Sequence, residues 1–223
     1  MTTTYHATSD PPQPGDGLDV PTRALVRFSA AITTASGEAV REALRDCARS
    51  RVPNAWIEEL ILQSYLFSGF PRTLNAAREW RRQLAEAGVA PQSPPATAPE
   101  GQGDWRTRGE ATCAIVYGAN YQKLRTNVRE LHPALDDWMV VEGYGKVLSR
   151  PGLDLLRREL CIVSACAVSG QDRQLLSHLK GALHAGASPG HLDSTLELLR
   201  DFCPRGTLSR ARLLWKKVRP SAA

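Results

Sequence analysis

Apolar residues along this chain recur every three or four positions, which is the spacing of amphipathic helices, and few runs alternate as exposed strands would. One predicted helix face in 189–203 carries Leu192, Thr195, Leu196, Leu199 and Phe202. Ser188 followed by Pro189 is a typical helix start, because a hydroxyl caps the first turn and proline lacks only an N–H that the first turn does not use. Gly186 can end the preceding helix in a left-handed conformation. The pattern predicts an all-α fold.

The segment 155–168 is apolar on almost every face after Glu159. A short strand buried on both sides would show the same composition, but about fourteen residues is long for a strand. A helix that is apolar all round is buried in the protein interior. We therefore expect 155–168 to form a central helix.

Two segments are too poor in apolar residues to order themselves. Residues 1–20 are polar with several prolines and predict a disordered tail, and residues 88–104 are rich in Pro, Gly, Ser and Ala and predict a linker. They divide the chain into two helical blocks, 21–87 and 105–218. The remaining composition is that of an ordinary globular protein.

The two blocks resemble each other. When 41–62 is set over 177–198, Pro53 falls on Pro189 and the apolar positions that follow also coincide. Each copy reads as helix, short turn with proline, and helix. We interpret the pattern as an internal duplication of a helical hairpin, with an additional helical segment at 105–147.

The charge balance argues against nucleic acid as a partner. The chain has 28 Lys and Arg against 23 Asp and Glu, a net charge of +5, without a dense basic patch interleaved with aromatic residues. Residues 179–199 resemble a helix-turn-helix, but the second helix would present Asp193 and Glu197 to the phosphates. DNA binding is therefore disfavoured.

The cysteines and the apolar runs indicate a compartment. Five cysteines are an odd number without the spacing of a disulfide framework, and 1–20 lacks the apolar core of a signal peptide. No stretch approaches the roughly 18 apolar residues of a membrane span. We expect a protein of the reducing cytoplasm with no membrane partner.

The second block contains the motifs of a known family. Residues 142–160 read EGYGKVLSRPGLDLLRREL, and HLKGALHAGASP begins at His178. The informative positions are Tyr144-Gly145, Arg150-Pro151-Gly152-Leu153, Arg158-Glu159-Leu160, His178, Ala182 and Gly186. Over about 111–200 this block resembles the carboxymuconolactone decarboxylase family. The resemblance implies an alkylhydroperoxidase D-like all-α fold and a homo-oligomer with sites near repeat or subunit boundaries.

The closing motif of that family is weak in the second block, which has Asp201-Phe-Cys-Pro204 in its place. The motif is clear in the first block, from Tyr65 through Gly69 and Pro71 to Asn75-Ala76. The block 21–87 therefore resembles a degenerate first repeat and 105–218 a second domain of the family. This division predicts either a composite site or one site that has decayed.

The related peroxidases carry Glu-x11-Cys-x2-Cys-x3-His. Counted from Glu159, their cysteine positions fall on Gln171 and Gln174 and their histidine position on His178. Cys161 and Cys166 cannot replace the missing pair, because five residues of helix rotate about 140° and rise about 7.5 Å, whereas a disulfide needs Cα atoms about 5.5 Å apart. Thiol-dependent peroxidase activity is disfavoured but stays an alternative.

His178, Glu159 and Arg150 are the candidate site residues. His178 can deliver a proton near neutral pH, Glu159 can orient it, and Arg150 can bind a substrate carboxylate through its planar guanidinium. The structural alternatives are a helix-face histidine bonded to a carbonyl, a helix-start carboxylate paired with an arginine, and a turn or subunit-contact arginine. We find no ligand pattern for a metal and expect no cofactor.

The resemblance implies a decarboxylase-like enzyme that acts without a cofactor on a small carboxylated lactone or ring acid. Loss of CO₂ would leave electron density on the ring, and His178 would protonate carbon. A non-catalytic oligomeric scaffold is the second alternative, since the closing motif is missing from the second block.

Overall fold

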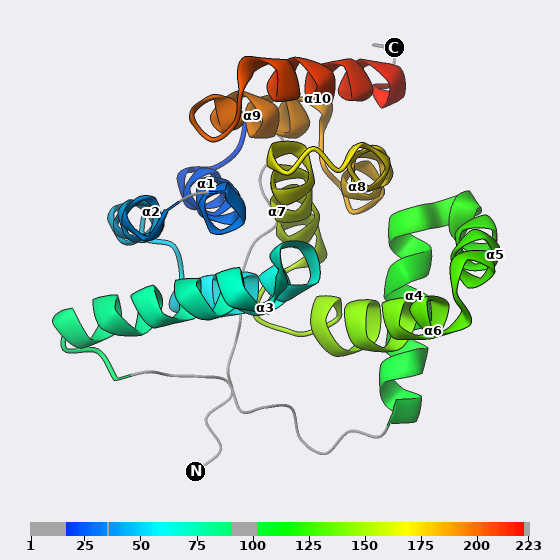
Figure 1. Ribbon diagram of the computed structural model, residues 1–223, viewed down its shortest axis with the longest axis horizontal. Helices are drawn as coiled ribbons and strands as arrows, with labels where there is room; N and C mark the ends of the chain where they lie inside the picture. The colour runs from blue at the N-terminus through cyan, green and yellow to red at the C-terminus, as the bar shows by residue number, and fades with distance from the viewer. Residues whose placement is uncertain (1–16, 35, 91–101, 221–223) are drawn as a thin grey trace.

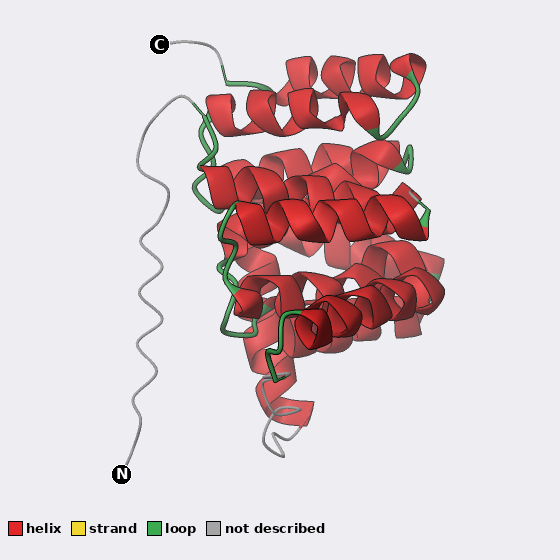
Figure 2. Ribbon diagram, turned by 90° about the vertical axis from the view of Figure 1, so that its left-hand side faces the viewer, coloured by secondary structure: helices red, strands yellow, loops and turns green. Residues whose placement is uncertain are grey.

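The computed structural model describes residues 17–34, 36–90 and 102–220, and every regular element in these segments is a helix (Figures 1 and 2). The α-helices are α1 (Val20–Thr34), α2 (Gly37–Arg49), α3 (Asn54–Glu86), α4 (Gln102–Tyr117), α5 (Tyr121–Leu131), α6 (Pro133–Trp138), α7 (Leu155–Val168), α8 (Asp172–His184), α9 (Pro189–Leu198) and α10 (Arg205–Val218). The described segments also contain two 3₁₀ turns, η1 (Gly118–Asn120) and η3 (Leu199–Asp201), and one π-helix, η2 (Met139–Leu148). The predicted all-α fold is confirmed.

Helix α7 occupies the middle of the molecule, with α1, α8, α9 and α10 arranged around it in Figure 1. Every residue from Leu156 to Val168 is buried, which confirms the expected central helix. Asp154 caps its start, since Asp154 Oδ1 accepts a hydrogen bond from the Arg157 amide at 2.9 Å. The helix therefore spans the residues that its sequence pattern predicts, 155–168.

Helices α1 and α7 are joined by two reciprocal hydrogen bonds. The Ser29 hydroxyl donates to the carbonyl of Cys161 at 2.7 Å, and the Ser164 hydroxyl donates to the carbonyl of Val26 at 3.0 Å. Both bonds are buried, and Ser29 and Ser164 occupy equivalent positions in their two helices. Such an exchange is what a local two-fold relation between the two blocks would produce.

The starts of the two helices also match. Gly17-Leu18-Asp19 precedes α1 and Gly152-Leu153-Asp154 precedes α7. Asp19 caps α1 by accepting from the Thr22 amide at 2.7 Å, as Asp154 does for α7. After these starts, α2 and α3 follow α1 as α8 and α9 follow α7. These correspondences support the predicted duplication.

The segment boundaries differ slightly from those expected. The predicted tail 1–20 lies mostly outside the described residues, but Gly17–Asp19 lead into α1, which begins at Val20 because Asp19 caps it. The predicted linker 88–104 also lies mostly outside them, and its last three residues form the start of α4. Helix α4 therefore begins three residues before the predicted start of the second block.

The turn before α9 has the local chemistry expected of it. Ser188 Oγ accepts from the His191 amide at 3.1 Å, and His191 Nδ1 accepts from the Ser188 amide at 3.3 Å. Gly186 has a φ of 99°, the left-handed conformation that ends α8. The expected helix start and stop are both confirmed.

Candidate functional site

A cavity of about 1230 Å³ lies between α3, the α5–α6–η2 segment and α8. Its walls are mostly apolar and aromatic. From the first block the walls include Leu62, Tyr65, Leu66, Phe67 and Phe70, and from the second block Tyr117, Leu124, Val128, Trp138, Met139, Tyr144 and His178. Both blocks therefore contribute walls to one cavity, as a composite site would require.

The first block reaches the cavity through a break in α3. Gly69 interrupts that helix with φ 77° and ψ 161°, and Pro71 follows it. Glycine permits the left-handed backbone, and proline cannot continue the hydrogen-bond ladder. Phe67 and Phe70 flank the break and line the cavity. The closing motif of the first block is thus the sequence that shapes this wall.

His178 and Glu159 form a hydrogen-bonded pair at the inner end of the cavity. His178 Nδ1 lies 2.8 Å from Glu159 Oε2, and both side chains are buried. A carboxylate in this position accepts from Nδ1–H and fixes the orientation of the ring. Within the described residues no hydrogen bond reaches His178 Nε2, and the ring lines the cavity. The free nitrogen is therefore available to a molecule bound there.

Aromatic rings hold the imidazole from two sides. Phe67 meets it edge-on at 5.7 Å between centroids, and Tyr117 lies at 6.4 Å. Tyr144 packs against Tyr117 at 6.2 Å. Burial raises the pKa of both phenols above the usual value, so both remain neutral near pH 7. The imidazole is thus surrounded by neutral aromatic rings at this end of the cavity.

A glycine makes room for the pair. A Cβ atom at Gly181 would lie 2.7 Å from Glu159 Oε2 and 2.6 Å from Val116 Cγ1. Glu159 is fully buried, and its Oε1 has no hydrogen-bond partner in the described part of the chain. A buried carboxylate with an unused oxygen is costly in a purely structural role. The contact of Glu159 with His178 gives this buried carboxylate a role that a purely structural explanation lacks.

Arg150, the predicted carboxylate anchor, is already paired. Its guanidinium makes a two-armed contact with Glu59, from Nε at 3.1 Å and from Nη2 at 3.0 Å. Arg158 reaches the same carboxylate with Nη2 at 2.8 Å. Both Arg150 and Glu59 line the cavity. This geometry makes Arg150 part of a link between α3 and the turn before α7, while no hydrogen bond within the described residues is made by its Nη1.

The remaining histidines and the glutamines have separate roles. His132 Nδ1 accepts from the Ala134 amide and caps α6, and His184 Nδ1 lies 2.9 Å from the Val116 carbonyl. Gln171 precedes α8, and Gln174 lines the cavity. Among residues 17–34, 36–90 and 102–220, no group of three or more His, Cys, Asp or Glu has the geometry to hold a metal ion.

The cysteine thiols are poorly placed for redox chemistry. Four of the five cysteines are buried. Burial raises the pKa of Cys47, Cys113 and Cys166 to about 12, and it also raises the pKa of Cys161. Cys203 is half-buried, and its pKa is also raised by burial. No two cysteines are joined in a disulfide.

We expect Ellman's reagent at pH 8 to label at most one thiol per native chain promptly, and all five after unfolding. The reason is that the thiolate is the reactive form and burial suppresses it. Thiol titration with and without guanidinium chloride measures both numbers. Prompt labelling of two thiols, lost after treatment with a hydroperoxide, would instead revive the peroxidase alternative.

Comparisons with known proteins agree with the fold and with the family resemblance. The model of the carboxymuconolactone decarboxylase family matches residues 137–213, which run from the end of α6 into α10 and include Glu159 and His178. Peroxisomal protein 2 of Schizosaccharomyces pombe is 30% identical over 151 residues, 66% of this chain and 68% of that protein. The chain belongs to the carboxymuconolactone decarboxylase family.

Proposed function

We propose that the protein is a carboxy-lyase that acts without a cofactor on a carboxylated lactone or a related ring acid. The observation that carries the proposal is the His178–Glu159 pair, whose free imidazole nitrogen borders a large apolar cavity. Such a nitrogen is suited to general acid–base work. Membership of the family supports the reaction class, since the family takes its name from a decarboxylase.

The proposed reaction needs one well-placed acid. The bond between the ring carbon and the carboxylate breaks, CO₂ leaves, and the electron pair stays on the conjugated ring. Protonated His178 then donates its Nε2 proton to carbon, and solvent returns a proton to Nε2. Glu159 is a positioning residue, because its carboxylate holds Nδ1–H and stabilises the imidazolium before transfer. The apolar walls limit access of water to the ring.

The test compares two histidines on the same helix. We expect His178→Gln to lower kcat/KM for decarboxylation of γ-carboxymuconolactone, followed by ultraviolet absorbance, by about a hundredfold or more. His184→Gln should leave the rate nearly unchanged, because His184 bonds the Val116 carbonyl away from the cavity lining. Glu159→Gln should lower kcat and shift its pH profile, because a neutral amide no longer stabilises the imidazolium.

Equal rates for the two histidine variants would remove His178 from the mechanism. If wild type turns over neither this lactone nor a panel of other ring acids, and thermal melts show folded protein, the decarboxylase proposal is wrong. The protein would then be better described as a non-catalytic oligomeric scaffold.

We also propose that the chain forms a homo-oligomer in the cytoplasm. Exposed apolar side chains near the cavity support self-association, among them Phe70, Leu131 and Trp138, which are 64%, 79% and 60% exposed. Light scattering measures the oligomer number.

No helix in the described segments is long and apolar enough to cross a membrane. The related yeast protein is named Peroxisomal protein 2. Imaging of a fluorescently tagged chain distinguishes a location in the cytoplasm from one in peroxisomes.

A further inference from the structure

We propose that the cavity binds an amphiphilic carboxylate whose apolar body is much larger than a compact lactone, and that Arg173 binds the carboxylate. The inference names the substrate class of the same site and in that respect rests on the proposed function. It is carried by the cavity volume, by the chemistry of the walls and by the pairing of the charged residues around them.

The volume exceeds what a small ring acid needs. The cavity measures about 1230 Å³, whereas an apolar cavity of roughly 150 Å³ accommodates benzene. A carboxylated lactone with about twice as many non-hydrogen atoms would need roughly 300 Å³ on the same scale. Most of the space would then remain unfilled or hydrated, although the walls are apolar. A ligand that fills it carries a long chain or several fused rings.

The walls away from His178 offer dispersion contacts rather than hydrogen bonds. They are formed by Leu62, Leu66, Phe67, Leu124, Val128 and Met139. Trp138 and Phe70 lie at the solvent side, where they are 60% and 64% exposed. Burial of apolar surface on such walls gives about 25 cal/mol per Å². The ligand that gains most from this surface is one with a large apolar body.

The charged residues around the cavity are paired, with one exception. Glu59 binds Arg150 and Arg158, as described above. Glu142 binds Lys146 at 3.2 Å. Glu58 accepts from Arg81 Nη2 at 3.0 Å and from Trp80.

The exception is Arg173. It lines the cavity, is exposed, and has no ion-pair or hydrogen-bond partner within residues 17–34, 36–90 and 102–220. Arg173 precedes His178 by five residues on α8, a rise of about 7.5 Å. A guanidinium with five free N–H groups binds a carboxylate with two parallel hydrogen bonds. A carboxylate held there leaves the rest of the ligand between His178 and the apolar walls.

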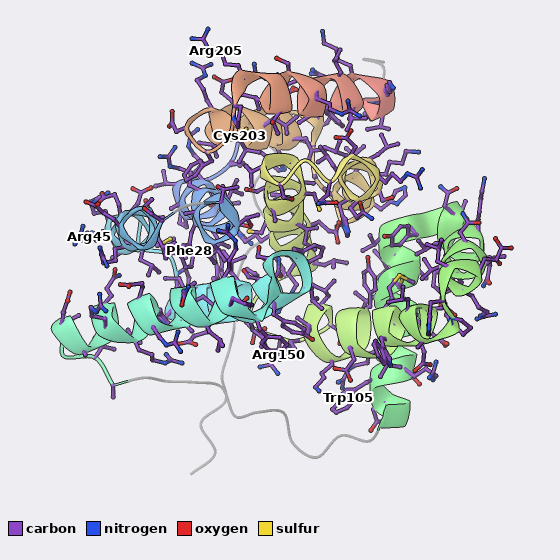
Figure 3. The ribbon with its side chains drawn as sticks, in the orientation of Figure 1. Phe28, Arg45, Trp105, Arg150, Cys203 and Arg205 are labelled. Atoms are coloured by element: carbon purple, nitrogen blue, oxygen red, sulfur yellow. The ribbon has the colours of Figure 1, made fainter. Side chains whose placement is uncertain are left out.

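Binding can be measured without turnover. Saturated straight-chain acids of six to twelve carbons are titrated into the full chain by calorimetry, with dodecanol as the uncharged match. Because each buried methylene contributes about 0.8 kcal/mol, we expect the affinity to rise about three- to fourfold per carbon. Arg173→Gln should weaken binding of the acid about tenfold and leave dodecanol binding unchanged. Arg205→Gln is the matched control, since Arg205 lies on α10, at the opposite side of the view from Arg150 in Figure 3, and does not line the cavity.

Two filled variants locate the binding in the cavity. A Cβ atom at Gly143 meets nothing within 4 Å, so Gly143→Phe places a ring in the empty space. Leu124→Trp fills the space from another wall and serves if the first variant fails to fold. Both should abolish the dependence on chain length while thermal melts show a folded protein.

Three results would overturn the inference. The first is affinity that does not increase with chain length, and the second is an equal effect of Arg173→Gln and Arg205→Gln. Retention of chain-length dependence in both filled variants would also overturn it, because the acids would then bind elsewhere. The saturated straight-chain acids have no conjugated ring, so their binding is measured without the proposed reaction. Binding without turnover therefore contradicts the proposed reaction alone, and turnover of the small lactone without binding of long acids contradicts this inference alone.

Discussion

Glu59→Gln is expected to lower the free energy of unfolding by about 3–5 kcal/mol, the usual effect of removing one partner of a buried ion pair. Glu59 is 2% exposed, and it is the carboxylate shared by Arg150 and Arg158. The amide of glutamine keeps the shape but not the charge. Two guanidinium groups, one of them fully buried, would lose their counter-charge.

Arg158 is the residue that makes this loss severe. It is 0% exposed, and its other arms donate to the Leu153 carbonyl at 3.0 Å and to Gln63 Oε1 at 3.2 Å. Burial lowers the pKa of Arg158 below the ordinary value, and Glu59 opposes that shift. Without Glu59 the buried cation has hydrogen bonds but no compensating charge. The link between α3 and α7 should loosen as a result.

Urea unfolding followed by circular dichroism measures the change. Glu42→Gln is the control, because Glu42 pairs with Arg45 and Arg49 on the surface and exposed pairs contribute little. The double variant Glu59→Leu with Arg158→Met should recover part of the loss, since an apolar replacement of a whole buried pair is often tolerated. A loss for Glu59→Gln no larger than for Glu42→Gln would contradict the assigned role.

The elements that the sequence predicts well are those set by local chemistry. The ends of α8 and α9 depend on Gly186, Ser188 and Pro189, which are neighbours in the chain, and α7 is identified by apolar residues on every face. Resemblance to the family also identified His178 and Glu159 as a pair, and they lie 2.8 Å apart. Both kinds of information are contained in short segments.

The features that could not be predicted depend on distant segments. Arg150 and Glu59 are separated by 91 residues, so no spacing rule joins them. The sequence therefore did not reveal this partner of Arg150, and its role as a carboxylate anchor stays a prediction. The volume of the cavity depends on how α3 breaks at Gly69 and how η2 crosses α4. One signal was available in the sequence: Gly-Leu-Asp occurs at 17–19 and again at 152–154. It aligns α1 with α7 more directly than the hairpin comparison does.

The crossing of α4 and η2 provides the second large effect. Gly145, the glycine of the Tyr-Gly motif, lies against α4 so closely that a Cβ atom there would overlap the Trp105 carbonyl oxygen and lie 2.7 Å from its carbon. Gly109 of α4 meets η2 in the same way, since a Cβ atom there would overlap the Val140 carbonyl oxygen. Two glycines therefore let the two backbones touch.

The π-helix is part of this arrangement. A π-helix has a wider turn than an α-helix, is rare, and is frequently found at functional sites. Here η2 supplies Met139, Tyr144 and Val147 to the cavity while its opposite side rests on α4. A displacement of η2 away from α4 would therefore move one wall of the cavity, so the stability of the crossing and the shape of the site are coupled.

We expect Gly145→Ala to lower the free energy of unfolding by about 3 kcal/mol, the upper end for overpacking, because backbone atoms cannot rotate away as a side chain can. Urea unfolding gives the value, and binding of a twelve-carbon acid reports the wall movement. Gly143→Ala is the matched control two residues away, where a Cβ atom meets nothing within 4 Å. If the two alanine variants unfold at the same urea concentration, close backbone contact is not what the Tyr-Gly motif provides.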